Sequence, residues 1–422
     1  MRPTHPSRVL VLLMVLLVGA LSVHTDVLAS SLETHSLGDF GFLVPDETDW
    51  MFNPALLGDE HQPWALVESE SAYDPSSERT YDSSGNLTSG LGSDTWSITV
   101  APSGVLPLAS GTLGFSAHAA PTSALSLSTD TTTSSMDLGI RAGYGTRLSP
   151  RLAIGASLQY ATLQRGERPS TGDSVPTYLS RSVRPWIGLV YHPDAWAPVE
   201  IALNPVYYWG ESYSTTTGDV TSTYSEPYVR VRLRTQHPGA QGSKLWLTGE
   251  HVQWSYTRRD ASGTATSETG YRRDAAGLTS EWVRAGGRLL AGAEVYNWAQ
   301  STESPTVSSV GETGIALRAG ASADLTPALQ LRAGVRADLV YRSESSRPSP
   351  GSDPTSTSAT LEVDADPYLG LGLEVADWTV DLEFPVGRSD VWTTTTENPL
   401  AGTKTVERSG VSALIVAARR SF

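Results

Sequence analysis

The sequence has no cysteine among its 422 residues. This excludes disulfides, thiolate metal sites and a lipid anchor attached through cysteine. A chain that crosses an oxidising compartment before it folds gains from lacking thiols. Lysine is nearly absent too, with Lys244 and Lys404 alone, and the formal net charge of −15 argues against nucleic acid as a partner. Hydrophobic residues at 39% and charged residues at 18% are both low for a globular protein of this size.

Long apolar runs are also scarce. The one clear run has thirteen residues, Val9 to Leu21, after the basic Arg2 and Arg8, and it is followed by Val27-Leu28-Ala29. This layout is typical of a secretory signal peptide with a small residue at the cleavage point. Thirteen residues are too few for a membrane-spanning helix. We therefore expect residues 1–29 to be removed on export.

What the chain has in abundance is segments with one apolar and one polar face. Between 135 and 163, one parity carries Met136, Leu138, Ile140, Ala142, Tyr144 and Leu148, and the other Asp137, Gly139, Arg141, Gly143, Gly145 and Arg147. Successive side chains of a strand point to opposite faces. Strands of soluble proteins average about 5–6 residues, and a membrane-spanning strand needs about 9–11. The observed runs of about thirteen therefore predict an outer-membrane β-barrel.

This alternation of apolar and polar residues, which we call the parity code, indicates sixteen strands joined by alternately short and long connections. The strands are expected near 64–73, 93–101, 111–120, 135–148, 151–163, 177–191, 197–208, 224–235, 243–257, 269–284, 286–299, 309–325, 328–342, 360–376, 377–388 and 406–422. Bacterial barrels keep short turns on the periplasmic side and long loops outside. A β-sandwich has no reason to sort its loops in this way. Fourteen strands would also fit, because the first two candidates are the weakest. We predict an all-β fold, a transmembrane antiparallel up-and-down β-barrel over 64–422.

Charged residues on the polar face must line the interior, because at mid-depth in a bilayer each costs roughly 2–4 kcal/mol. The expected lumen-lining residues are Arg141, Arg147, Arg230, Arg232, Arg234, Arg318, Arg332, Arg336, Glu374, Asp381 and Glu383. Six of these arginines are expected to face the three acids, Glu374, Asp381 and Glu383, across or along the lumen. They are Arg230, Arg232, Arg234, Arg318, Arg332 and Arg336. Such opposed charges could orient a dipolar solute. Alternatively they neutralise each other as cross-strand pairs, and this is the interpretation that we favour.

Aromatic residues near the predicted strand ends fit membrane interfaces, which favour amphipathic rings. They are Tyr144, Tyr160, Tyr191, Tyr207, Trp209 and Tyr341. A final aromatic, Phe422, is typical of barrels whose last strand is recognised by the barrel assembly machinery, the protein partner that we predict besides outer-membrane lipid. Arg420 departs from this pattern, because a hydrophobic residue is usual there.

The segment before the first strand carries a resemblance to a known family. Leu37-Gly38-Asp39-Phe40-Gly41 and the stretch 49–57, which contains Asn53-Pro54-Ala55, precede a strand near Trp64, and Gly111 to Phe115 lie in an early hairpin. This resembles the long-chain fatty-acid transporter (FadL/PorV-like) family of outer-membrane barrels. The resemblance implies that residues 30–63 form a plug inside the barrel, with Asn53, Pro54 and Ala55 as its motif, and that a hydrophobic compound is transported. The family's fourteen strands conflict with our sixteen.

Signals for catalysis are weak. Outer-membrane lipid hydrolases place His and Ser two apart on a strand, and the His5–Ser7 pair falls in the signal peptide. Glu362, Asp364 and Asp366 share one face and could hold calcium, although pairing with lumen arginines is the better explanation. We predict no catalytic residue, cofactor or metal. The expected function is a passive transporter or porin for small or hydrophobic solutes in the outer membrane of a Gram-negative bacterium. The alternative is a structural, surface-presenting barrel without an open pore.

Overall fold

The computed structural model describes residues 48–422 except 82–86, 127–130, 170–174, 194–197, 215–218, 239–242, 285, 304–306, 348–355, 386–391, 399–402 and 410–411. The predicted signal peptide 1–29 and the stretch 30–47 therefore lie outside the described residues. Within the described part of the chain, no helix is long and apolar enough to cross a membrane.

Two short 3-10 helices, η2 (Asp49–Met51) and η3 (Pro54–Asp59), precede the strands. The strands are β1 (Trp64–Tyr81), β2 (Leu87–Leu108), β3 (Gly111–Ser126), β4 (Thr131–Ser149), β5 (Leu152–Pro169), β6 (Val175–Tyr191), β7 (Val199–Tyr213), β8 (Val220–Pro238), β9 (Ser243–Asp260), β10 (Ala265–Arg284), β11 (Gly287–Glu303), β12 (Val307–Thr326), β13 (Leu329–Arg347), β14 (Ser356–Val375), β15 (Trp378–Pro385), β16 (Trp392–Asn398), β17 (Thr403–Ser409) and β18 (Ser412–Ser421).

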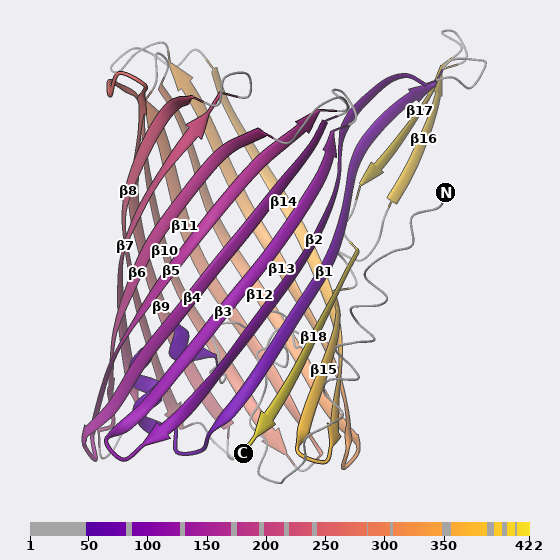
Figure 1. Ribbon diagram of the computed structural model, residues 1–422. Helices are drawn as coiled ribbons and strands as arrows, with labels where there is room; N and C mark the ends of the chain where they lie inside the picture. The colour runs from indigo at the N-terminus through magenta and orange to yellow at the C-terminus, as the bar shows by residue number, and fades with distance from the viewer. Residues whose placement is uncertain are drawn as a thin grey trace.

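The strands close into an antiparallel barrel. Each strand from β1 to β14 pairs with the next, β15 pairs with β18, and β18 pairs with β1, which gives a ring of sixteen (Figure 1). The other two strands, β16 and β17, pair with each other, and β17 also pairs with the end of β1 between Ser77 and Tyr81. β14 pairs with β15 from Tyr368 to Val375. The prediction of a sixteen-strand up-and-down barrel is confirmed.

The two faces of the wall differ as the parity code predicts. Along β12, Ile315 and Leu317 are exposed on the outside, while the alternate residues Ala316 and Arg318 are buried on the inside. Outward apolar side chains on other strands are equally open, such as Ile140 at 64% exposure. An apolar surface of this extent is stable only when lipid covers it.

The strands are longer than the sequence predicts. β2 has 22 residues, although we expected a strand only near 93–101, and β1 continues to Tyr81 through a stretch that we expected to be loop. The Ser-, Thr- and Gly-rich segments at the far end of the barrel thus pair as strands. Backbone pairing needs no apolar side chain, so composition alone placed these boundaries too early.

Arg420 occupies an outward position of β18 for a visible reason. Its guanidinium carbon lies 5.7 Å from the Trp378 ring and 5.0 Å from the Phe422 ring. Cation–π contacts of this kind attract a cation to aromatic faces. The arginine that departs from the apolar parity is thus covered by two rings.

Candidate functional site: the barrel lumen

The described part of the N-terminal segment, Thr48 to Pro63 (the lead segment), lies inside the barrel near the end where β4 and β5 meet in a short turn (Figure 1). Asn53 caps η3, because its Oδ1 accepts a hydrogen bond from the Ala55 amide at 3.3 Å. Pro54 begins the helix, where its missing N–H costs nothing. The Asn-Pro-Ala motif therefore starts a compact turn, and η3 packs on β3, β4, β5 and β6.

Glycines on these four strands let the lead segment approach the wall closely. A Cβ added at Gly114 would lie 2.8 Å from the Trp50 ring, and one at Gly143 would lie 3.2 Å from it. A Cβ at Gly155 would lie 2.6 Å from the Ala55 amide nitrogen. Side chains at these positions would displace the segment, so the glycines form a cradle shaped for it. The cradle glycines are Gly114, Gly143, Gly145, Gly155 and Gly188.

A buried ion pair ties the lead segment to the neighbouring strands β7 and β8. Arg234 on β8 has no exposed surface, and it lies 2.6 Å from Asp49 and 2.9 Å from Glu200 on β7. The Trp246 ring lies 5.9 Å from the guanidinium carbon. A buried charge is tolerated only when it is paired, so the two carboxylates and the guanidinium stabilise each other.

Two further predicted arginines contact the lead segment. Arg147 lies 2.7 Å from Asp59, which also lies 3.1 Å from His192. Arg141 donates hydrogen bonds to the Met51 carbonyl and to Gln159. These side chains therefore bind the lead segment instead of lining open space.

Burial raises the pKa of the Glu60 carboxyl above its usual range, even though Arg419 opposes the shift.

Beside the lead segment lies a cluster of guanidinium groups around Glu250 on β9. Arg232 donates from Nε to Glu250 at 2.7 Å, Arg230 lies 3.4 Å from the same carboxylate, and Arg273 on β10 pairs with it as well. Arg273 also lies 3.0 Å from Glu294 on β11, and Arg318 lies 3.6 Å from Glu294. We call this group the arginine layer.

The remaining predicted lumen residues lie on the other part of the wall. Arg332 lies 2.6 Å from Asp381, and Arg336 lies 2.7 Å from its strand neighbour Asp338. Glu383 has no exposed surface, whereas Glu374 is exposed next to the short turn between β14 and β15. The Arg332–Asp381 pair joins one of the expected arginines to one of the three expected acids. The other five arginines contact acids that sequence reasoning had not selected.

An arc of aromatic side chains faces the lumen beyond the arginine layer, and sequence reasoning missed it. Trp254 on β9, Tyr271 on β10 and Trp298 on β11 stack in succession, with ring centroids 5.1 and 5.8 Å apart. Tyr178 stacks on Tyr224 with ring centroids 5.6 Å apart, and Tyr256 lies tilted beside Tyr224 with centroids 5.3 Å apart. Apart from Tyr224, these rings are half-buried. These rings have the inward parity of their strands, as Glu250 and Arg273 do, and this parity could have predicted their place in the lumen.

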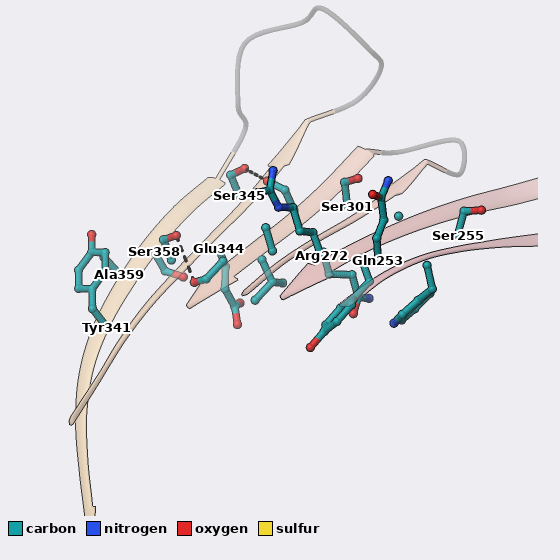
Figure 2. A pocket seen from close by; sticks show the side chains of 18 residues that line it. Gln253, Ser255, Arg272, Ser301, Tyr341, Glu344, Ser345, Ser358 and Ala359 are labelled. Carbon is teal, nitrogen blue, oxygen red and sulfur yellow. Dashed lines mark hydrogen bonds between the residues drawn. The ribbon is translucent and has the colours of Figure 1, made fainter. Parts of the chain in front are cut away.

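Four of the aromatics predicted near strand ends are exposed on the outward face, although Tyr160 and Tyr207 lie in the middle of β5 and β7. Tyr160, Tyr191, Tyr207 and Tyr341 are between 41% and 53% exposed. A groove of about 810 Å³ crosses the far ends of β9 to β14 beside Tyr341 (Figure 2). Trp254 and Tyr271 line it together with residues of the opposite, outward parity such as Gln253, Ser255 and Arg272. Most of its lining residues have the outward parity, so the groove belongs mainly to the outer surface.

Three histidines contact aspartate side chains. His118 hydrogen-bonds Asp137, His192 contacts Asp59, and His251 lies 2.7 Å from Asp274. None of these pairs includes a hydroxyl nucleophile. Within the described residues, no group of three His, Asp or Glu side chains is placed to hold a metal ion. The side chain of Asp364, one of the three predicted acids of β14, is not described.

No family profile and no curated protein sequence matches this chain. Among solved structures, a FadL homologue of Pseudomonas aeruginosa is similar over 95% of this chain and 99% of its own, with 12% identity and a TM-score of 0.43. A mutant of the TodX monoaromatic hydrocarbon channel covers 92% of this chain and 98% of its own, also with 12% identity and a TM-score of 0.43. The Escherichia coli ferric-catecholate import receptor Fiu is 8% identical, with a TM-score of 0.39 over 86% of this chain and 82% of its own.

Proposed function

We propose that this protein is a passive transporter of the outer membrane of a Gram-negative bacterium, through which hydrophobic compounds cross the barrel lumen. The observation that carries the proposal is the inward aromatic arc. Most of its rings are half-buried, so they present part of their surface to the interior instead of packing fully into a core. Aromatic surface exposed in an enclosed space favours apolar solutes. A scaffold barrel without a pore would have no use for them.

The lead segment is suited to act as a plug. It lies at the short-turn end, and it is bound by the cradle glycines, by Arg234 and by Arg147. A solute that enters at the far end would meet the aromatic arc first and the lead segment last. Passage then requires the lead segment to move, and deletion of residues 30–61 should raise the conductance of the barrel in planar bilayers.

The outer membrane is the location that the surface supports best. The apolar belt and the antiparallel ring suit a bilayer, and the predicted signal peptide suits export. Membrane lipid is accordingly the proposed neighbour of the outward face. We also propose that Phe422 is recognised by the barrel assembly machinery. Both proposals depend on the protein being inserted as a barrel.

The transport proposal is tested by uptake into whole cells. Radiolabelled toluene, an uncharged aromatic probe, is supplied to cells that make the full chain and to matched cells without it. We expect faster uptake with the protein, and a several-fold loss when Trp254→Ala removes an inward ring. Trp209→Ala removes an outward ring and is the matched control, which should keep the full rate.

The opposite result would be uptake that does not depend on the protein, with unchanged conductance after deletion of 30–61. A barrel that behaves so would be a surface-presenting scaffold. Heat-modifiable mobility of each variant on denaturing gels verifies that it folded, because intact barrels resist unfolding at room temperature.

A further inference from the structure

We propose that the lumen has a binding site for aromatic anions, in which the stack of Trp254, Tyr271 and Trp298 holds the ring and Arg230 and Arg273 hold the anionic group. A compound such as an arene carboxylate has the required chemistry. The inference rests on the proposed function, and it narrows the solute from any hydrophobic compound to one with a flat ring and a negative charge.

The arginine layer presents positive charge to the lumen. The side chains of Arg230 and Arg273 are 28% and 29% exposed, whereas the Glu250 carboxylate that they share is only 9% exposed. A solute in the lumen therefore meets the guanidinium groups and not the carboxylate beneath them. Local charge complementarity then favours an anion over a cation or a neutral group.

Arg230 is also loosely engaged. Its Nε lies 3.4 Å from Glu250 without the geometry of a hydrogen bond, and this buried nitrogen has no hydrogen-bond partner in the described part of the chain. A buried donor without a partner costs free energy. A carboxylate delivered from the lumen to the exposed side of the layer would add charge-assisted hydrogen bonds to two guanidinium groups that share Glu250, of which Arg273 also pairs with Glu294.

The rings lie at the correct spacing above the charges. Trp254 is the register partner of Tyr228 on β8 and of Tyr271 on β10. Each tyrosine is two residues from an arginine of the layer on the same strand face, Tyr228 from Arg230 and Tyr271 from Arg273. Two residues of a strand span about 7 Å. A ring stacked on this tier can thus place an attached carboxylate at the arginine layer.

Neither half of the site explains the arrangement by itself. An alkyl carboxylate would satisfy the arginines but could not stack its chain face to face on Trp254. An uncharged arene would stack but would leave the guanidinium groups without an added acceptor. A compound with an arene and an anionic group uses both the aromatic stack and the arginines. We therefore propose aromatic anions as the ligands of this site.

The test compares uptake of radiolabelled benzoate, toluene and hexanoate at pH 7 by cells that make the full chain. We expect protein-dependent uptake of benzoate to exceed that of hexanoate. The double variant Arg230→Gln/Arg273→Gln should lower benzoate uptake about tenfold and leave toluene uptake within twofold. Arg288→Gln is the matched control, because Arg288 lies on β11 within the lumen but pairs with Glu281 at 2.8 Å.

A second variant covers the case in which the double variant fails to fold. Glu250→Gln removes the shared carboxylate and keeps both arginines, so benzoate uptake should rise while toluene uptake stays unchanged. Toluene uptake that depends on the protein, with benzoate uptake that does not, would overturn this inference and leave the proposed function intact. Uptake of neither probe would instead count against the proposed function.

Discussion

Replacing Asp49 by asparagine should loosen the lead segment without harming the barrel wall. Asp49 lies 2.6 Å from Arg234, and neither side chain has much access to water. Removing one partner of a buried pair costs about 3–5 kcal/mol. The cost here should be lower, about 2–3 kcal/mol, because Glu200 still pairs with Arg234 at 2.9 Å.

The cysteine-free chain offers a direct assay for this change. Ala55 in η3 has no exposed surface, so an Ala55→Cys reporter should react with a water-soluble maleimide only when the lead segment leaves its cradle. When release is rapid relative to labelling, the labelling rate follows the released population. Because 1.4 kcal/mol corresponds to a factor of ten, Asp49→Asn should speed labelling about 30- to 150-fold.

A second reporter separates release of the lead segment from loosening of the whole barrel. Ala316 on β12 is fully buried, and β12 is not among the strands that η3 packs on. Asp49→Asn should leave the labelling of an Ala316→Cys reporter unchanged. An Ala55→Cys rate that rises less than twofold would refute the role of the ion pair, and an equal rise at both reporters would refute the idea of local release.

Three further changes test other parts of the same reasoning. Gly155→Ala should destabilise the docked lead segment by about 1–3 kcal/mol and speed its maleimide labelling, because the added Cβ would meet backbone atoms. Gly249→Ala is the control and should not change labelling, because the nearest atoms to its added Cβ are 4.0 Å away. Val335→Arg places a charge in the middle of the outward apolar residues of β13, and should lower the free energy of unfolding in bilayers by roughly 2–4 kcal/mol in a urea titration, whereas Val335→Leu should not. Because the pKa of Glu60 is raised in the docked state, docking of the lead segment is strongest below the ordinary carboxyl pKa of 4.5 and weakens as the pH rises through the higher pKa of the docked state. The labelling rate of Ala55→Cys, corrected for ionisation of the thiol, should therefore increase with pH. Glu60→Gln should abolish this pH dependence.

The sequence predicted the barrel well because one periodicity decides it. Lipid on one side and the lumen on the other force alternate residues of a strand such as β13 to be apolar, and this alternation persists along every strand that crosses the bilayer. The ends of strands were predicted less well. β2 continues beyond the bilayer, where both faces meet water and the apolar signal disappears.

The interior was harder to predict, because its partners come from distant parts of the chain. Arg234 could be assigned to the inside from parity, but its partner Asp49 precedes the barrel by many residues. Nothing in the local pattern connects the two. The cradle glycines carry the same limitation, since Gly143 and Gly155 are polar-face residues whose role becomes visible only when Trp50 and Pro54 lie against them.

Along the barrel axis, the inward faces of β8 and β9 change their chemistry in an order that suits stepwise passage. Aromatic rings come first from the far end, at Tyr228 and Trp254, and the arginine layer follows. Arg232 connects that layer to the lead segment, because it donates to Glu250 at 2.7 Å while its guanidinium carbon lies 4.5 Å from the Phe52 ring. Arg232 therefore links a change in the charge around Glu250 directly to the lead segment, which must move for a solute to pass. The same parity that builds the wall thus also sets the sequence of surfaces that a solute would meet.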